Sequence, residues 1–294
     1  MLEYFTLKTK NQGIIDVGIL EPKSPKGIVQ IIHGALEYKE RYLPFGEFLQ
    51  KNGYIVVLSD NRGHGKSISD THSKGFMESW EDLVSDQNEI CQFVKKKFPT
   101  LPYYLLGHSF GSILARLFLQ KHDGEIDKLV LTGTVNYIPI VPLGLKLSGT
   151  FLKIYGPFGH SKLLAKLTGD LEAKDNSWLS NNPENNLKAK NDPQMLSEYP
   201  VKSSLTIWES NYQLKQYHHF KCAHPELKIL SLVGSEDVKI TGGDKGLKDT
   251  VQTLNKIGYK NVKSIVMPGM KHEVLNEKNN QLVFNEILNF LKEK

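Results

Sequence analysis

One serine in this chain has the sequence context of a catalytic nucleophile. Ser109 stands at the centre of Gly107-His108-Ser109-Phe110-Gly111, between an apolar run and a segment with helical periodicity. The pattern Gly-x-Ser-x-Gly between a strand and a helix is typical of a nucleophile elbow, whose tight turn holds the serine hydroxyl above the sheet. The serine must then adopt a backbone conformation that is unfavourable for any residue but glycine. The motif therefore predicts nucleophilic chemistry at Ser109.

Such a nucleophile needs a base and an acid, and candidates for both follow in the chain. A serine hydroxyl reacts poorly at neutral pH unless a neutral imidazole takes its proton, and a carboxylate orients that imidazole. In enzymes with this elbow, the acid and then the histidine come after the serine. Asp237 and His272 each lie in a loop that follows a late predicted strand. We predict Asp237 as the acid and His272 as the base, with Glu236 and Asp244 as alternative acids.

Two backbone amides are expected to bind the oxyanion that forms when a serine attacks a carbonyl. Phe110 comes one residue after the nucleophile and offers its N–H at a helix N-terminus. A second donor should come from the loop after an early strand, and Ala35 in His33-Gly34-Ala35-Leu36 is the candidate. We expect His33 to support this loop rather than to take part in the chemistry.

The glycine-rich segment Asp60-Asn61-Arg62-Gly63-His64-Gly65-Lys66-Ser67 carries further reactive side chains. We interpret Asp60, Arg62 and His64 as residues that fix a tight loop by hydrogen bonds. No second cluster of ligands completes a metal site, so no metal is expected.

Strands and helices alternate along most of the chain, which predicts a mostly parallel central sheet flanked by helices. Asn11-Gln12-Gly13 separates the first two strands and predicts an opening hairpin. The predicted strands are 3–7, 14–20, 28–32, 54–58, 103–106, 128–132, 228–233 and 262–267, and the main helices are 45–49, 80–98, 113–119, 205–217, 245–257 and 280–291.

The alternation stops after the sixth strand. Residues 134–200 contain six prolines and short amphipathic pieces but no buried-strand pattern. An unstructured loop of that length is rare in a compact domain. We therefore predict that residues 134–203 form a helical cap, or lid, inserted into a core made of residues 1–133 and 204–294.

Composition excludes several functional classes. Of the 294 residues 39% are hydrophobic and 23% charged, which is typical of a folded globular protein. The net charge is +5, but the lysines are scattered, so no nucleic-acid partner is expected and membrane-surface contact should be transient at most. The N-terminus has no signal-peptide pattern and no run is long enough to span a bilayer. With the widely separated Cys91 and Cys222 interpreted as free thiols, a cytoplasmic location is expected.

The motifs together resemble those of the monoacylglycerol lipase and lysophospholipase group of α/β-hydrolases, which overlaps with the serine aminopeptidase-like hydrolases. The resemblance covers almost the whole chain in order. Its segments are His33-Gly34-Ala35-Leu36-Glu37 with Arg41-Tyr42, the loop 60–67, the elbow 107–111, Gly234-Ser235-Glu236-Asp237, Lys271-His272-Glu273-Val274-Leu275-Asn276-Glu277 and, more loosely, Ser177-Trp178-Leu179-Ser180 and Asn191-Asp192-Pro193 in the cap.

This resemblance implies an α/β-hydrolase fold and cofactor-independent hydrolysis of carboxylic esters. A mono-acyl lipid, such as a monoacylglycerol or a lysophospholipid, is the expected substrate because the cap supplies apolar and aromatic side chains. The expected substrate-binding residues are Leu36, Ile138, Val141, Phe151, Tyr155 and Trp178.

Two other functions fit parts of the pattern. A prolyl-type aminopeptidase would need a carboxylate for the free amino group of its substrate, and Glu172, Glu184 or Glu198 in the cap could supply it. A binding protein on an inactive hydrolase fold is the second alternative, which the presence of all three triad residues disfavours.

Overall fold

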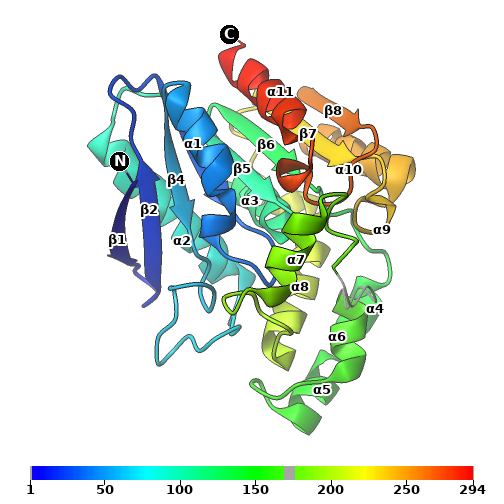
Figure 1. Cartoon of the computed structure of the whole chain (residues 1–294). Coiled ribbons are helices and arrows are strands. Elements are labelled where there is room, and N and C mark those ends of the chain that lie inside the picture. The colour runs from blue at the N-terminus through cyan, green and yellow to red at the C-terminus, as the bar shows by residue number, and fades with distance from the viewer. Residues whose placement is uncertain (1, 169–175, 294) are drawn as a thin grey trace.

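The computed structural model describes residues 2–168 and 176–293, and one eight-stranded sheet forms its centre (Figure 1). The strand order is β1-β2-β4-β3-β5-β6-β7-β8. β2 pairs antiparallel with β1 and with β4, whereas all other neighbours are parallel. The predicted mostly parallel sheet and its opening hairpin are therefore confirmed. The strands are β1 (Leu2–Lys8), β2 (Ile14–Leu20), β3 (Gly27–Ile32), β4 (Tyr54–Ser59), β5 (Tyr103–His108), β6 (Lys128–Thr132), β7 (Lys228–Gly234) and β8 (Asn261–Met267).

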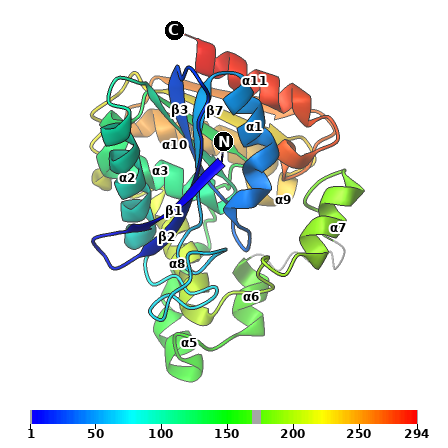
Figure 2. The same ribbon diagram turned by 60° about the vertical axis from the view of Figure 1, so that its left-hand side comes forward.

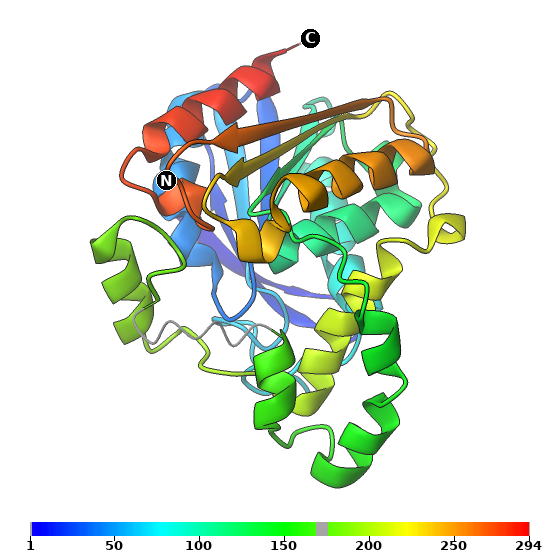
Figure 3. The same ribbon diagram turned by 90° about the vertical axis from the view of Figure 1, so that its right-hand side faces the viewer.

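Helices cover both faces of the sheet, so its central strands are buried throughout and consist of continuous apolar runs. α1 (Leu43–Lys51) and α11 (Asn280–Lys292) pack on one face, and α2 (Trp80–Lys97), α3 (Phe110–His122) and α10 (Gly243–Ile257) pack on the other (Figure 3). The remaining short pieces are α9 (Val238–Thr241) and the 3-10 turns Lys39–Tyr42, Asp123–Glu125, Tyr217–His219 and Val274–Asn276.

Among the described residues, five helices lie between β6 and β7. They are α4 (Val141–Leu145), α5 (Ser148–Tyr155), α6 (Lys162–Thr168), α7 (Pro183–Asn191) and α8 (Val201–Gln213). α5 and α6 lie at the end of the molecule opposite α11 and the C-terminus (Figures 1 and 2). α8 packs against α4, α5 and α6 and also against α2 and α3. The predicted boundary between residues 203 and 204 falls inside α8, because this helix contributes apolar side chains to both regions. No helix within the described ranges is long and apolar enough to cross a bilayer.

Strand and helix approach very closely at the elbow. A Cβ atom on Gly111 would lie 2.2 Å from the carbonyl oxygen of Ile32 and 2.7 Å from that of His33. Gly107 is similarly restricted, since its Cβ would lie 2.2 Å from the carbonyl oxygen of Gly111. Only glycine therefore lets α3 start directly over the ends of β3 and β5.

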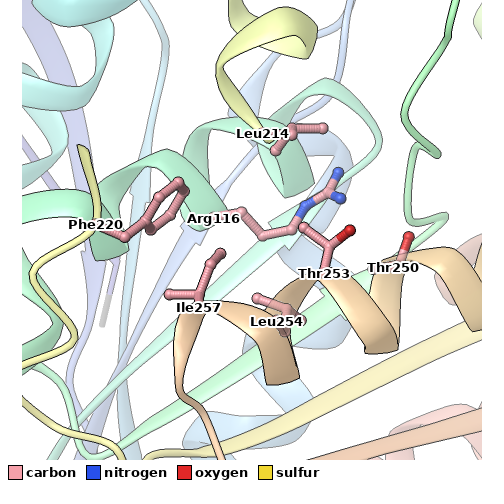
Figure 4. Close-up of a pocket in the computed structure, with 7 residues that line it drawn as sticks. All are labelled: Arg116, Leu214, Phe220, Thr250, Thr253, Leu254 and Ile257. Carbon is pink, nitrogen blue, oxygen red and sulfur yellow. The ribbon is translucent and has the colours of Figure 1, made fainter. Parts of the chain in front are cut away.

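A buried arginine ties α3 to the start of the inserted helices. The Arg116 guanidinium donates to the carbonyl oxygens of Ser112 (2.9 Å) and Val135 (2.7 Å), and the Ser112 hydroxyl accepts from Val135 N–H (3.2 Å). Burial lowers the pKa of Arg116 to about 9. Figure 4 shows this side chain beside a cavity of about 10 Å³, large enough for about one water, which is lined by Arg116, Leu214, Phe220, Thr250, Thr253, Leu254 and Ile257.

The close approach at the elbow predicts that adding one methyl group at Gly111 destabilises the protein, whereas the same change at an unobstructed glycine does not. Gly111→Ala should lower the free energy of unfolding by at least ~2 kcal/mol, because the obstructing atoms belong to the backbone of β3 and cannot rotate away. Gly124→Ala is the matched control, since nothing lies within 4 Å of its Cβ position. Its effect should stay within about 0.5 kcal/mol. Denaturant unfolding measures both, and equal stability of the two variants would contradict the packing described here.

Candidate active site

Ser109 occupies the strained turn that the elbow pattern predicts. It follows β5 and caps α3 with φ 52° and ψ −121°, in the region that favours glycine. Its N–H donates to the carbonyl oxygen of Thr132 on β6 (3.0 Å), and its own carbonyl accepts from Ser112 N–H (2.8 Å). The side chain is half-buried. Hydrogen bonds on both sides of the residue thus hold the backbone in this conformation and fix the direction of the hydroxyl.

Asp237 and His272 meet beside this turn, although 35 residues separate them in the sequence. His272 Nδ1 lies 2.7 Å from Asp237 Oδ2, and both side chains are buried. A carboxylate only accepts, so Nδ1 carries the proton and Nε2 is left as the acceptor. The acid that contacts the histidine is therefore Asp237, whereas Glu236 accepts a hydrogen bond from Asn181 (3.0 Å).

Aromatic rings hold His272 next to the elbow. Its ring centroid lies 4.9 Å from that of His108, the residue before Ser109, and 5.1 Å from that of Trp178. Gly133, with φ 50°, permits this approach, since its Cβ would lie 2.9 Å from both imidazoles. The described residues offer the Ser109 hydroxyl no hydrogen-bond partner in this structure. Hydrogen bonds between nucleophile and base often tighten only when substrate binds.

The surroundings of His272 favour its protonated form. Burial alone would lower the pKa of His272, but the adjacent Asp237 carboxylate, assisted by Glu273 and Glu37, raises it above the ordinary value. His108 responds in the opposite direction, because burial and the nearby His272 lower its pKa well below the usual range. Of these two neighbouring imidazoles, His272 is thus the one suited to accept a proton.

The two amides predicted to bind an oxyanion have no hydrogen-bond acceptor among the described residues, whereas neighbouring amides are occupied. Gly34 N–H donates to Glu37 Oε1 (2.6 Å), and Leu36 N–H donates to the hydroxyl of Tyr199 (2.7 Å). Ala35 and Phe110 N–H stay available. The two loops touch, since a Cβ on Gly34 would lie 2.9 Å from Ser109 Cβ.

Tyr199 supports this loop from the segment before α8, and the sequence analysis did not identify it. Its hydroxyl accepts from Leu36 N–H and donates to His64 Nε2 (2.7 Å), while His64 Nδ1 donates to the carbonyl of Arg62 (2.9 Å). Burial and the nearby His33 lower the pKa of His64 to about 3, so it stays neutral and keeps this tautomer. The contact joins residues 163 positions apart, and no local pattern could have indicated it.

A largely buried guanidinium links the loop after β3, the loop that carries His272 and the inserted helices. Arg41 donates to Glu37 (3.0 Å), to both carboxylate oxygens of Glu273 (2.7 and 2.6 Å) and to Asn185 on α7 (3.2 Å). Asn185 also donates to Glu273 (2.7 Å). Burial would raise the pKa of Glu273, but Arg41 beside it holds that pKa well below its usual range. Arg41, Glu37 and Glu273 lie inside the matched motifs and Asn185 lies outside them, and nothing in the sequence indicated that these residues meet.

The glycine-rich loop 60–67 is held by hydrogen bonds and ion pairs, as predicted. Asp60 accepts from Lys39 N–H (2.8 Å) and Lys39 Nζ (2.7 Å), and Arg62 pairs with Asp86 (2.5 Å). His33 Nε2 accepts from Asn61 N–H (2.9 Å), so His33 supports this loop as well as its own. In the part of the chain that the structure describes, no group of three or more His, Cys, Asp or Glu side chains could hold a metal ion.

The predicted substrate-binding residues come from several segments, and three of them, Val141, Phe151 and Tyr155, lie in contact among the inserted helices. Leu36, with φ 63°, lies in the loop after β3, and the Trp178 ring lies against that of His272. Trp178 also lines a cavity of about 100 Å³ that borders Asp237. Val141 is buried among the inserted helices. The remaining three are Ile138, which is 38% exposed, and Phe151 and Tyr155, which lie on α5.

Comparison with known proteins identifies relatives over most of the chain. A family model described as serine aminopeptidase, S33, matches residues 23–279. The monoacylglycerol lipase of Mycolicibacterium smegmatis is 26% identical over 270 residues, which cover 91% of this chain and 88% of that protein. Lysophospholipase L2 of Escherichia coli is 32% identical over 108 residues, which cover 36% of this chain and 32% of that protein.

Solved structures show the same fold. A thermostable carboxyl esterase from Bacillus coagulans, in complex with glycerol, superposes with a TM-score of 0.86 at 24% identity, covering 99% of this chain and 97% of that one. A soluble variant of the monoglyceride lipase from Saccharomyces cerevisiae superposes with a TM-score of 0.74 at 17% identity, covering 99% and 94%. The predicted α/β-hydrolase fold is therefore confirmed.

The contacts of Arg41 with Glu37, Glu273 and Asn185, here termed the Arg41 bridge, predict how a substitution of Arg41 affects stability. Arg41→Met should lower the free energy of unfolding by about 3–5 kcal/mol, because the buried carboxylates of Glu37 and Glu273 lose their counter-charge. Adding Glu273→Gln should restore part of the loss by removing one of these charges. Lys260→Met, which breaks the fully exposed pair with Glu226 (2.6 Å), is the control and should leave the unfolding midpoint nearly unchanged. A loss for Arg41→Met no larger than for this control would show that the bridge is not needed.

Proposed function

The chain belongs to the serine aminopeptidase S33 family, and from that membership we propose that it is a serine hydrolase of carboxylic esters whose preferred substrates are mono-acyl lipids. One observation carries the proposal most directly. Asp237 and His272, from two loops, meet beside the strained elbow at Ser109, next to two unoccupied backbone amides. This set matches the chemical requirements for acyl transfer through a serine.

In the proposed mechanism Ser109 attacks the ester carbonyl while His272 Nε2 takes the hydroxyl proton. Asp237 holds the proton on Nδ1 and stabilises the imidazolium that forms. Ala35 and Phe110 N–H donate to the developing oxyanion, and the N-terminus of α3 adds its positive dipole. His272 then protonates the leaving alcohol. A water molecule, activated by the same imidazole, releases the acid and regenerates Ser109.

The lipid substrate is proposed from the relatives, which include enzymes named monoacylglycerol lipase and lysophospholipase. We further propose that residues 134–203, with α8 shared between both parts, act as the cap over the site. Leu36 and Trp178 are the predicted contacts that the geometry supports best, since both adjoin the catalytic loops.

The prolyl aminopeptidase alternative receives no support from the cap carboxylates. Glu184 is exposed at the start of α7, and Glu198 is exposed and lies 3.2 Å from His160. Glu172 lies outside the described residues. Neither of these two described carboxylates is thus held ready for a substrate amino group.

Activity against a substrate panel tests the proposal. Rates on p-nitrophenyl esters should rise from acetate toward medium and long acyl chains, and monoacylglycerol or lysophospholipid should be cleaved faster than proline naphthylamide. Ser109→Ala should lower kcat by at least ~10³-fold and abolish labelling by a fluorophosphonate probe. Labelling that survives this substitution, or faster cleavage of the amide, would contradict the proposal.

The raised pKa of His272 predicts the acid side of the pH profile. His272 must be neutral to accept the serine proton, so activity is present above its pKa and is lost as the pH falls through it. The midpoint of this loss in kcat/KM should therefore lie above the ordinary histidine value of 6.5. Asp237→Asn should move the midpoint to lower pH, because it removes the raising charge, and should reduce the rate by about 10⁴-fold. An unchanged midpoint in this variant would argue against Asp237 as the acid.

A further inference from the structure

Among the described residues, Arg116 on α3 is a buried cation without a paired counter-charge. Its side chain is 4% exposed, and no carboxylate of the described ranges lies within 4 Å of its guanidinium. The two other arginines of the chain differ in this respect, since Arg41 pairs with Glu273 and Arg62 pairs with Asp86. A buried charge that lacks a partner is strongly unfavourable. The surroundings of Arg116 therefore need a compensating group.

The protein groups around Arg116 do not supply that compensation. Asp249 on α10 acts on Arg116 electrostatically, but this carboxylate pairs with Lys215 (2.6 Å). The hydrogen bonds of the guanidinium go to the backbone oxygens of Ser112 and Val135, which satisfy two N–H groups without cancelling the charge. Burial lowers the pKa of Arg116 to about 9, so the side chain is still charged at neutral pH.

The cavity beside the guanidinium offers further hydrogen-bond donors. Figure 4 shows the guanidinium ending between Leu214 and two threonines of α10, Thr250 and Thr253. Neither threonine hydroxyl makes a hydrogen bond to another described residue, and Arg116 Nη1 has no acceptor among them. A hydroxyl and a guanidinium N–H both donate. None of the seven described residues that line the cavity is acidic, so the donors converge on a space that lacks a negative group.

We propose that this cavity, here termed the Arg116 cavity, binds one small monovalent anion such as chloride, which pairs with the guanidinium and accepts hydrogen bonds from Thr250 and Thr253. Its volume of about 10 Å³ admits a single particle about as large as a water molecule, which excludes phosphate and sulfate. The bound anion joins α3 to α10 and stabilises the folded state by mass action. The site is independent of the catalytic assignment.

Thermal unfolding at fixed ionic strength tests the proposal, with sodium chloride replacing sodium gluconate. Gluconate is too large for the Arg116 cavity, so the exchange changes the occupant without changing the screening of surface charges. The Tm of the wild type should rise by at least about 2 °C and level off as chloride increases. A Tm that does not depend on chloride would overturn the proposal.

Substitutions locate the bound ion. Thr250→Val removes one donor but keeps the shape of the side chain, and should reduce the chloride-dependent rise in Tm by at least about half. Arg116→Met should abolish the rise. Should Arg116→Met fail to fold, as judged by circular dichroism, the double variant Thr250→Val with Thr253→Val replaces it. Thr150→Val, exposed on α5, and Lys121→Met, which removes one charge from the last turn of α3, are the controls and should retain the full rise.

A rise that persists in both cavity variants, or that falls equally in the controls, would overturn the proposal, because chloride would then act elsewhere on the protein. Crystals grown in sodium bromide identify the occupant directly, since bromide scatters anomalously and water does not. An anomalous peak within hydrogen-bond distance of the Arg116 guanidinium is expected. A water molecule there without such a peak would overturn the proposal. A bromide peak without a chloride-dependent Tm would also overturn it, as binding at crystal concentration only.

Discussion

The guanidinium of Arg41 fixes the relative positions of the segments that form the candidate site. Arg41 contacts Glu37 in the loop after β3, Glu273 beside His272, and Asn185 on α7. Two buried carboxylates would repel each other, and each would favour protonation, without a cation between them. The bridge therefore makes the geometry of one loop depend on the other two. A displacement of the histidine loop would leave a buried charge unpaired, which is a strong constraint on where His272 can lie.

Four of the five buried histidines in the described residues show how environment gives one residue type different chemistry. His33, His64 and His108 are kept neutral by burial, and the first two have both ring nitrogens occupied by loop hydrogen bonds or by Tyr199. Only His272 faces a carboxylate, Asp237, and only its pKa is raised. The structural histidines thus fix the loops as hydrogen-bonding groups of constant charge, while the charge of His272 can change during a reaction.

The sequence predicted the features that depend on local pattern and chain order. Each strand and the elbow have a characteristic run of residues, and Asp237 could be placed because it follows its own strand. Contacts between distant segments could not be predicted from local pattern and chain order. Tyr199 meets Leu36 across 163 positions, and the Arg41 bridge joins loops whose proximity only the folded sheet creates. The division at residue 203 was placed by composition, which cannot show that α8 packs in two directions at once.

In the inserted helices, the sequence likewise could not show which apolar side chains are buried and which are exposed. The apolar residues of segment 134–203 supported one interpretation from sequence, a lining for an acyl chain. The structure separates them: Val141 packs inward against α8, whereas Ile140 and Leu143, on the other side of the same turn, face outward. A helix that is apolar on every side has no periodicity that distinguishes these directions, because periodicity reports contrast between faces. For such a helix, the fold alone shows which face packs on the protein and which face is exposed.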